Sequence, residues 1–315
     1  MRMPFSVALI ILAGAAFADD TADKYSDSVL YDKPIEIAPG IYSAIGATQP
    51  PTYENAGHNN NLSFIVTTDG VVVINGGASW KLAEALHHEI AEVTDRPVKL
   101  VINENGQGHS MLGNSYWAAK DVPILAHVDA AADFADSEGP EGLEMLKSYA
   151  RENATGTSLV EPTETFTDMK TIQMGDTRIE VLHLGPAHSP GDTQVWLPDQ
   201  KVLIAGDIAF SERMPPIFQG TCTSCWIETF ETKLEALGAE IIVPGHGAPT
   251  DLKTVRHGTI DYLKDLREKI GKHIENDGDL ANAYYVDQSQ WEYMDTFEEL
   301  ATKNAGAVFV EMEFE

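Results

Sequence analysis

Basic residues are scarce in this chain of 315 residues. Only 21 Lys and Arg stand against 49 Asp and Glu, which gives a formal net charge of −28 at pH 7 with His neutral. Such a surface repels phosphate backbones and anionic lipid headgroups, which argues against nucleic-acid binding and electrostatic docking to membranes. The expected ligand is therefore a small-molecule substrate, and the composition identifies no protein partner.

Long apolar runs are also missing. The apolar residues 7–12 fall well short of the roughly 20 residues that a membrane span needs. They follow the basic Arg2 and precede a small-x-small site formed by Ala16, Phe17 and Ala18. This order is typical of a cleaved signal peptide over residues 1–18. It predicts a mature chain that starts near Asp19, is periplasmic or secreted, and has no membrane insertion after cleavage.

Only two cysteines are present, Cys222 and Cys225, in the run Cys-Thr-Ser-Cys. In an oxidising compartment a disulfide between them is the expected state, with a free or redox-active pair and a metal-associated pair as alternatives. The ring that such a bond closes is small, so its entropic stabilisation is small. Two cysteines exclude a zinc site made of four thiolates.

Hydrophobic periodicity predicts an α/β fold. Strands are expected at residues 62–67, 71–74, 98–102, 123–126, 169–174, 179–184, 193–197, 201–205 and 241–244. Helices are expected at 80–93, 113–120, 227–237 and 251–276, and residues 129–164 form a polar, helical excursion over the surface. Two strand-rich halves, each closed by helices, predict two sheets packed face to face between helical layers.

The predicted domain covers residues 19–278. The remaining residues, 279–315, form a C-terminal extension that carries Trp291, Tyr293 and Phe297. We expect a helix there that packs on the domain.

Side chains capable of metal chemistry follow several predicted strands. They are His109 in the run ENGQGH, His188 in GPAHSPGD, Asp207 after a strand and a glycine, and His246 in PGHG. Catalytic and ligand groups commonly lie at strand ends in α/β proteins. Imidazole and carboxylate are good ligands for Zn²⁺ or Fe²⁺, so this distribution predicts a metal pocket.

These motifs, in this order, resemble those of the metallo-β-lactamase-fold superfamily of metallohydrolases. The resemblance covers about residues 36–275 and includes the hairpin at 61–77, GxxHxxG at His188, the strand-Gly-Asp at Asp207 and PGHG at His246. It implies an αββα sandwich of two mixed sheets and a metal-dependent hydrolase. The hairpin departs from the family pattern at Asn75, which takes the place of an Asp.

A larger departure lies in the family motif His-x-His-x-Asp-His. Here the motif has become Glu104-x-Gly106-x-Gly108-His109. Two ligand positions have no side chain, and Gly108 also removes a group that transfers protons in the family. The resemblance therefore implies one metal ion, most simply Zn with Fe as the alternative. Its candidate ligands are His109, His188, Asp207 and His246.

The other site residues follow from the same comparison. Glu104 is either an additional ligand or a proton shuttle, and His188 is either a ligand or an oxyanion partner. The predicted catalytic residues are Glu104 and Asp207. Two side chains are candidates for the pocket: His58, for which an ordinary loop histidine is the favoured alternative, and Phe218, for which ordinary packing is the favoured alternative. His127 and His183 lie in or beside strands, where a role in the core or beside the ligands is expected.

The sequence thus predicts an exported metal-dependent hydrolase that acts on an ester, lactone, amide or related bond. The alternative is a non-catalytic periplasmic binding or accessory protein on a decayed hydrolase scaffold, because a fold can be retained after its site has lost its function.

Overall fold

The computed structural model describes Tyr25, residues 27–313 and Glu315. The predicted signal peptide at residues 1–18 and the predicted mature start at Asp19 lie outside these residues. In the part of the chain that is described, no helix combines the length and the apolar character that crossing a membrane requires.

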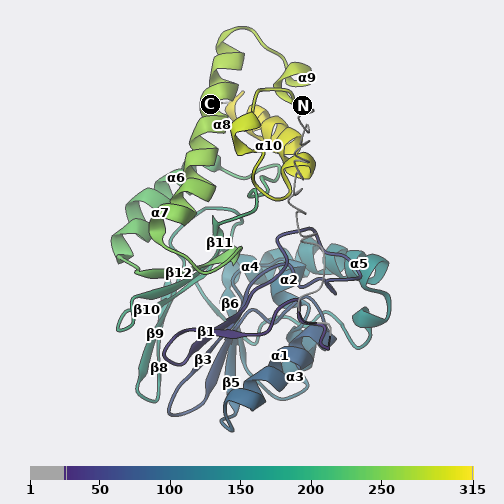
Figure 1. Ribbon diagram of the computed structural model, residues 1–315, viewed down its shortest axis with the longest axis vertical. Coiled ribbons are helices and arrows are strands. Elements are labelled where there is room, and N and C mark those ends of the chain that lie inside the picture. The colour runs from purple at the N-terminus through teal and green to yellow at the C-terminus, as the bar shows by residue number, and fades with distance from the viewer. Residues whose placement is uncertain (1–24, 26, 314) are drawn as a thin grey trace, which may run out of the picture.

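Two β-sheets pack face to face, and helices lie on both outer sides (Figure 1). The first sheet contains, in spatial order, β1 (Ile35–Ala38), β2 (Ile41–Ala44), β3 (Leu62–Val66), β4 (Val71–Ile74), β5 (Val98–Ile102), β6 (Ile124–His127) and β7 (Glu164–Phe166). The second contains β12 (Ile241–His246), β11 (Val202–Phe210), β10 (Gln194–Leu197), β9 (Thr177–Leu182) and β8 (Met169–Met174). Both sheets mix parallel and antiparallel pairs, so the predicted αββα sandwich is confirmed.

The helices surround this pair of sheets. They are α1 (Trp80–Val93), α2 (Gly108–Met111), α3 (Asn114–Ala118), α4 (Val128–Asp133), α5 (Gly139–Ala150), α6 (Thr223–Thr229), α7 (Leu252–Val255), α8 (Tyr262–Glu275), α9 (Leu280–Ala283) and α10 (Phe297–Met312). Wider π-helical turns connect some of them, at Phe134–Glu138, Phe230–Leu234 and Arg256–Asp261. The helices expected at 227–237 and 251–276 are therefore continuous helical segments that contain π turns.

Alternation along β4 shows why the chain builds separate core layers. Val72 belongs to the apolar layer between the two sheets, whereas Val71 and Val73 belong to the layer under α1. Successive side chains of a strand point to opposite faces, so a fully apolar strand must be covered on both sides. The α1 side chains Leu82 and Leu86 supply the cover on the outer face.

The second sheet repeats this logic around β11. Val202 and Ile204 contribute to the layer between the sheets, while Leu203 and Ala205 face a third layer that contains Trp226. Helices α6 and α8 close this outer layer. The strand expected at 201–205 continues beyond Ala205 to Phe210.

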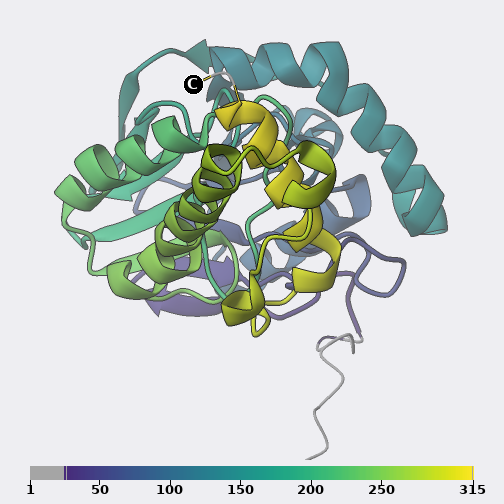
Figure 2. The same ribbon diagram turned by 90° about the horizontal axis from the view of Figure 1, so that it is seen from above.

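The excursion at 129–164 is helical as expected, but it is more than a surface loop. Helices α4 and α5 form a small core of their own with α2, in which Phe134 and Leu146 pack against Met111. The segment ends in β7, a three-residue strand at the edge of the first sheet that the sequence pattern did not predict. Viewed from above, α5 lies along one side of the molecule (Figure 2).

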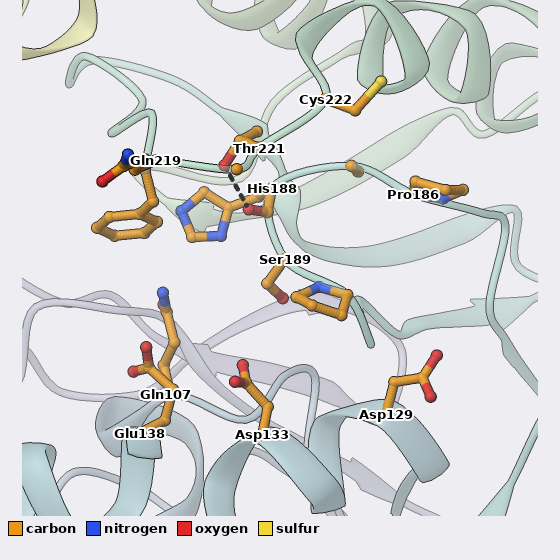
Figure 3. Close-up of a pocket in the computed structure, with 14 residues that line it drawn as sticks. Gln107, Asp129, Asp133, Glu138, Pro186, His188, Ser189, Gln219, Thr221 and Cys222 are labelled. Atoms are coloured by element: carbon orange, nitrogen blue, oxygen red, sulfur yellow. Dashed lines mark hydrogen bonds between the residues drawn. The ribbon is translucent and has the colours of Figure 1, made fainter. Parts of the chain in front are cut away.

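Helix α4 and the π turn that follows it face the loop at residues 186–190 and the loop at 218–222 across a cavity (Figure 3). This cavity adjoins the cluster of candidate metal ligands, because His188 lines both spaces. The fold therefore builds the candidate site from the carboxyl ends of strands on one side and from the α4–α5 segment on the other.

The C-terminal extension shares the outer core of the second sheet. Trp291, Met294, Val308 and Phe309 are buried in the same layer as the α8 side chains. The Asn304 amide donates hydrogen bonds to the Pro215 carbonyl and the Tyr262 hydroxyl, at 2.8 and 2.9 Å. We infer that the extension stabilises the domain.

Phe309→Ala tests this inference. Its side chain is only 4% exposed, so truncation should lower the free energy of unfolding by ~3–5 kcal/mol through lost burial and a cavity. Tyr285→Ala removes an aromatic ring from the same extension that is 81% exposed, and it should change stability by less than ~0.5 kcal/mol. Urea unfolding of both variants measures the difference, and equal effects would contradict the inference.

Candidate metal centre

Asp207 lies inside β11, at an irregularity that turns its side chain toward the site. The pairing of β11 with β12 shifts register on both sides of Gly206, whose φ is +66°. Such bulges bend a strand and redirect its side chains. Opposite the carboxylate, a Cβ atom on Gly245 would stand 2.0 Å from Asp207 Oδ1, so only glycine leaves room for it.

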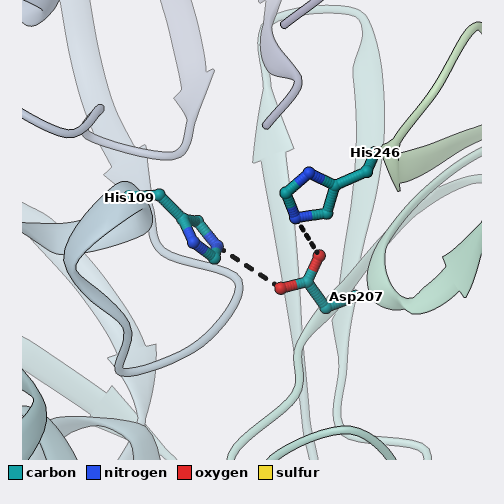
Figure 4. A group of neighbouring side chains, drawn as sticks. All are labelled: His109, Asp207 and His246. Carbon is teal, nitrogen blue, oxygen red and sulfur yellow. Dashed lines mark ion pairs between the residues drawn. The ribbon is translucent and has the colours of Figure 1, made fainter. Parts of the chain in front are cut away.

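Two histidines contact the Asp207 carboxylate from different elements (Figure 4). His246 ends β12, and its Nε2 lies 3.4 Å from Asp207 Oδ1. His109 lies in α2, and its Nε2 is 3.4 Å from Asp207 Oδ2. One ligand atom from each of the three residues falls within 4.8 Å of the other two. Residues that are about 140 positions apart in the sequence thus form one compact group of nitrogen and oxygen ligands.

Charge and burial oppose each other in this group. Burial alone would raise the pKa of Asp207, but the His246 and His109 rings hold it well below its usual value. Burial would likewise lower the pKa of His109, but the Asp207 and Glu104 carboxylates raise it to about 10. In the metal-free cluster a proton on His109 therefore balances the buried carboxylate. A metal ion would take the place of that proton, since a ligating imidazole must be unprotonated there.

His246 is oriented for ligation by its second nitrogen. Nδ1 donates a hydrogen bond to the Asn59 carbonyl, which leaves Nε2 free to face Asp207. Burial and the nearby Arg213 cation lower the pKa of His246 well below its usual value, so the ring is neutral. A backbone acceptor that fixes the tautomer is a common support for metal-binding histidines.

The polar atoms at the centre fit a metal ion. His109 Nε2 and Asp207 Oδ1 are buried without a hydrogen-bond partner among the described residues. Buried polar atoms normally have partners, so unpaired ones need an explanation such as an ion. Two imidazoles and one carboxylate form a donor set suited to Zn²⁺ or Fe²⁺.

His188 stands beside this group rather than within it. Its Nδ1 is 3.9 Å from Asp207 Oδ2, and the side chain is 2% exposed with both ring nitrogens unpartnered. Burial lowers its pKa to about 4, so the ring is neutral at physiological pH. The Phe218 ring lies 5.2 Å away in an edge-on contact.

Glu104 is held at the cluster by its backbone. Its N–H donates to Asn75 Oδ1 at 3.1 Å, and its carbonyl accepts from the Thr193 N–H at 2.6 Å. Glu104 Oε1 lies 3.5 Å from His109 Nε2 and has no hydrogen-bond partner among the described residues. Burial and the Asp207 charge raise the pKa of this carboxyl. Asn75, where the family pattern has an Asp, thus positions Glu104.

Helices α4 and α5 occupy the space beside Gly106 and Gly108. A Cβ atom on Gly106 would stand 2.6 Å from the Ala130 carbonyl oxygen of α4. One on Gly108 would stand 3.1 Å from a methyl of Leu112 and 3.4 Å from Gly142 of α5. The backbone at both positions contacts helices. At Gly106 this contact leaves no room for the ligand side chain that the family motif has there.

The remaining predicted site residues lie in different places. Phe218 lines both cavities next to the cluster. His58 is not among the described residues that line the two cavities: its ring is fully buried, and its Nδ1 accepts the Tyr31 N–H at 2.8 Å. A disulfide joins Cys222 and Cys225.

His127 and His183 lie away from the ligands. Their rings stack on each other, with centroids 4.0 Å apart. His127 Nε2 donates to the Thr167 carbonyl at 2.6 Å, and His183 Nδ1 donates to the Asp192 carbonyl at 2.9 Å. These bonds give both rings a structural role in the loops around the site.

Two site residues escaped the sequence analysis. Asn105 Nδ2 donates to Asp207 Oδ2 at 3.0 Å, and the Arg213 guanidinium lies 3.1 Å from His246 Nδ1. Arg213 is a buried cation in a chain with few basic residues, directly after the strand that carries Asp207. The scarcity of basic residues and the position shortly after that strand were the available signal, whereas Asn105 had none beyond its neighbour Glu104.

A family model described as the metallo-beta-lactamase superfamily matches residues 56–246, more than half of the chain. The matched stretch contains every candidate ligand, from His109 to His246.

Individual relatives are distant. A linear primary-alkylsulfatase from Pseudomonas sp. is 22% identical over 221 residues, covering 59% of this chain and 41% of the alkylsulfatase. The chain thus spans about two fifths of the length of that relative. A metallo-beta-lactamase type 2 from Bacillus sp. is 24% identical over 210 residues, covering 65% of this chain and 73% of the relative.

Solved structures share the fold. A metallo-beta-lactamase from Pontibacter korlensis superposes with a TM-score of 0.60 at 19% identity, covering 74% of this chain and 99% of its own. A metallo beta lactamase from Erythrobacter litoralis gives a TM-score of 0.56 at 14% identity, covering 74% of this chain and 96% of its own. At these identities the likeness concerns the architecture.

The contact of Gly106 with α4 predicts unequal effects of two similar substitutions. Gly106→Ala places a methyl group against a backbone carbonyl that cannot move alone, and should cost ~1–3 kcal/mol through overpacking. Gly108→Ala meets the end of a flexible leucine and gains helix propensity, so its net effect should be below ~1 kcal/mol. Urea unfolding compares the two, and a Gly106→Ala variant as stable as Gly108→Ala would refute the close approach.

Proposed function

The chain belongs to the metallo-beta-lactamase superfamily, and from this premise we propose that it is a hydrolase with a single catalytic metal ion. The observation that carries the proposal is the compact group of His109, Asp207 and His246, whose ligand atoms lie within 4.8 Å of one another. The glycines in the degenerate motif, together with the helices packed against them, support one ion rather than two.

Zn²⁺ is the proposed ion, because two imidazoles and one carboxylate leave an open position in its preferred four-coordinate site. Fe²⁺ is the alternative, since the same donor set is a facial triad. When bound, the ion would polarise the scissile bond and lower the pKa of a water molecule at the site.

The surrounding residues position these ligands. Asn105 donates to Asp207 and fixes the carboxylate plane, while the Asn59 carbonyl sets the tautomer of His246. Such supporting hydrogen bonds hold ligands in productive orientations and raise metal affinity.

Glu104 is proposed as the group that transfers a proton. Its carboxyl lies 3.5 Å from His109 Nε2 but outside the compact group of three ligands, which favours a proton shuttle over a fourth ligand. Its raised pKa is closer to neutral pH, and a carboxyl group exchanges protons most effectively when its pKa is near the working pH. It would accept a proton from the attacking water and deliver it to the leaving group.

His188 is proposed as an oxyanion partner. The ring is neutral, buried and unpartnered, and it lines the cavities on both sides. An N–H of this ring would donate to the oxygen that gains negative charge during hydrolysis, which is the form of stabilisation that contributes most in such sites.

The bond cleaved is proposed to be an ester, lactone, amide or related bond of a small molecule. The cavity over the ligands has a volume of about 450 Å³, a size suited to a small substrate. The names of relatives refer to β-lactam and alkyl sulfate substrates, which indicates that one scaffold in this superfamily supports the cleavage of different bonds.

We also propose that residues 1–18 direct export and that the mature protein acts in the periplasm or outside the cell. The Cys222–Cys225 disulfide supports an oxidising compartment, because such bonds persist where thiols are not kept reduced.

Metal content tests the ligand assignment. Protein purified without chelator should hold about one equivalent of Zn or Fe. His246→Ala should lower metal affinity about tenfold or more, because two remaining ligands hold a divalent ion poorly against water. Inductively coupled plasma mass spectrometry after dialysis measures the content.

His127→Ala is the matched control, since it also removes a buried histidine but lies outside the cluster. It should keep its metal. Equal metal content in wild type and His246→Ala would sink the assignment, and wild-type protein without any metal would favour the non-catalytic accessory protein.

Glu104→Gln separates the two roles open to that residue. If Glu104 shuttles protons, kcat for 4-nitrophenyl acetate should fall by about 10²–10⁴ while metal content stays unchanged. Glu144→Gln, an exposed change on α5, should leave both quantities unaltered. Loss of the metal in Glu104→Gln would instead make Glu104 a ligand.

A further inference from the structure

A second cavity adjoins the metal centre and differs from it in charge. Its volume is about 530 Å³, and it shares Gln107, Glu138, His188 and Phe218 with the cavity over the ligands. Because the two spaces have these walls in common, a substrate held over the ligands has an adjoining chamber for its remaining part.

Among the described residues, three carboxylates line this chamber and no Lys or Arg does. They are Asp129 and Asp133 of α4 and Glu138 of the π turn that follows, all on one wall. Figure 3 shows the Asp133 and Glu138 carboxylates directed across the cavity toward the loop of His188 and Ser189, whereas the Asp129 carboxylate points aside. This wall belongs to the α4–α5 segment that packs against Gly106 and Gly108.

Two of these acids, Asp133 and Glu138, lack internal partners, whereas Asp129 Oδ2 lies 3.7 Å from His127 Nδ1. Among the described residues, none forms an ion pair or a side-chain hydrogen bond with the carboxylates of Asp133 and Glu138, although both side chains are partly buried. Burial raises the pKa of both carboxyl groups, and the neighbouring Asp136 and Asp133, respectively, raise it further. The His109 charge lowers the pKa of Glu138 and so compensates this negative charge in part, and a positive charge placed in the cavity would relieve the rest.

The opposite wall supplies a second sign of a ligand, from the residue that is also proposed as the oxyanion partner. His188 is 2% exposed and lines the cavity with both ring nitrogens unpartnered. The neighbouring Phe218 ring is 48% exposed, an aromatic surface of the kind that attracts cations. An unpaired buried imidazole, an open aromatic ring and facing carboxylates together form a built pocket.

A metal ion is a poor occupant for this chamber. In the described part of the chain, the three acids do not bring ligand atoms within 4.8 Å of one another, and the only triad that does so is the metal centre itself. A cation larger than a bare ion, with apolar surface for Phe218, matches the spacing better.

We propose that this acidic chamber binds the alkylammonium group of the substrate, so that the hydrolysed bond belongs to a small molecule that carries a positive charge. The proposal rests on the proposed hydrolase function for the orientation of the bond, but the binding of the cation does not depend on turnover. The negative charge of the chamber would also exclude anionic substrates, since like charges repel in a partly buried site.

Binding isotherms with three isosteric probes test the charge preference. Choline carries the cation, 3,3-dimethyl-1-butanol is its neutral isostere, and 3,3-dimethylbutanoate carries a negative charge. Titrated calorimetrically into the metal-loaded protein at fixed ionic strength, choline should bind at least about tenfold more tightly than the alcohol, and the anion should not bind. Equal binding of choline and the alcohol would overturn the proposal, as would tighter binding of the anion.

Variants locate the binding. Asp133→Asn with Glu138→Gln should weaken choline binding about tenfold or more and leave the alcohol unaffected. Asp136→Asn removes the same charge from the same π turn, but its exposed side chain does not line the cavity, so binding should change less than twofold. Equal losses in the pocket variant and in Asp136→Asn would show a general effect of net charge and refute the pocket. Displacement of choline by 1 mM Ca²⁺ or Mg²⁺ would refute it in favour of a metal ion.

Hydrolysis separates this proposal from the proposed function. Acetylcholine should have a higher kcat/KM than its neutral isostere 3,3-dimethylbutyl acetate, by about tenfold or more. Choline binding without hydrolysis of either ester would retain the cation pocket and reject the hydrolase. Hydrolysis of both esters at equal rates without choline binding would retain the hydrolase and reject the cation pocket.

Discussion

The buried Asp207 carboxylate is the constraint on which the rest of the site depends. A charge removed from water is stable only with partners, and Asp207 obtains them from two separate segments: Asn105 and His109 after β5, and His246 at the end of β12. These contacts depend on local backbone features, such as the register shift around Gly206 and the absence of a side chain at Gly245. The two sheets meet at this carboxylate, so its hydrogen bond and ion pairs form only when the sandwich is packed.

The degenerate motif gains a physical explanation from the α4–α5 segment. Loss of the ligand side chains at positions 106 and 108 is matched by helices that approach the backbone there, with the Ala130 carbonyl nearest Gly106. The same segment holds a core of its own through Phe134 and Leu146. A scaffold decaying at random would leave a void at these positions, whereas here the space is filled. The close packing fits a site remodelled around one ion.

This remodelling also changes what surrounds the ion. The side of the pocket formed by strands presents neutral imidazoles and the Arg213 cation, whereas the side formed by α4 and the following π turn presents carboxylates without partners. The overall excess of acidic residues suits solubility, but charges on the outer surface are screened within about 10 Å at 0.1 M salt. Partly buried acids such as Asp133 and Glu138 are screened less, so they act on what enters the cavity.

The sequence by itself determined the layer architecture, because alternation in strands such as 71–74 and helical periodicity in 80–93 are local patterns that specify which faces are buried. It also indicated His109, Asp207 and His246, since each follows a strand next to glycine, and strand ends converge. Only the tertiary structure decided that β11 continues to Phe210, that His58 turns into the interior and that α4 fills the space beside Gly106. The roles of Arg213 and Asn105 were likewise decided only by the structure, because a polar side chain acquires its role from atoms that lie far away along the chain and are brought near only by folding.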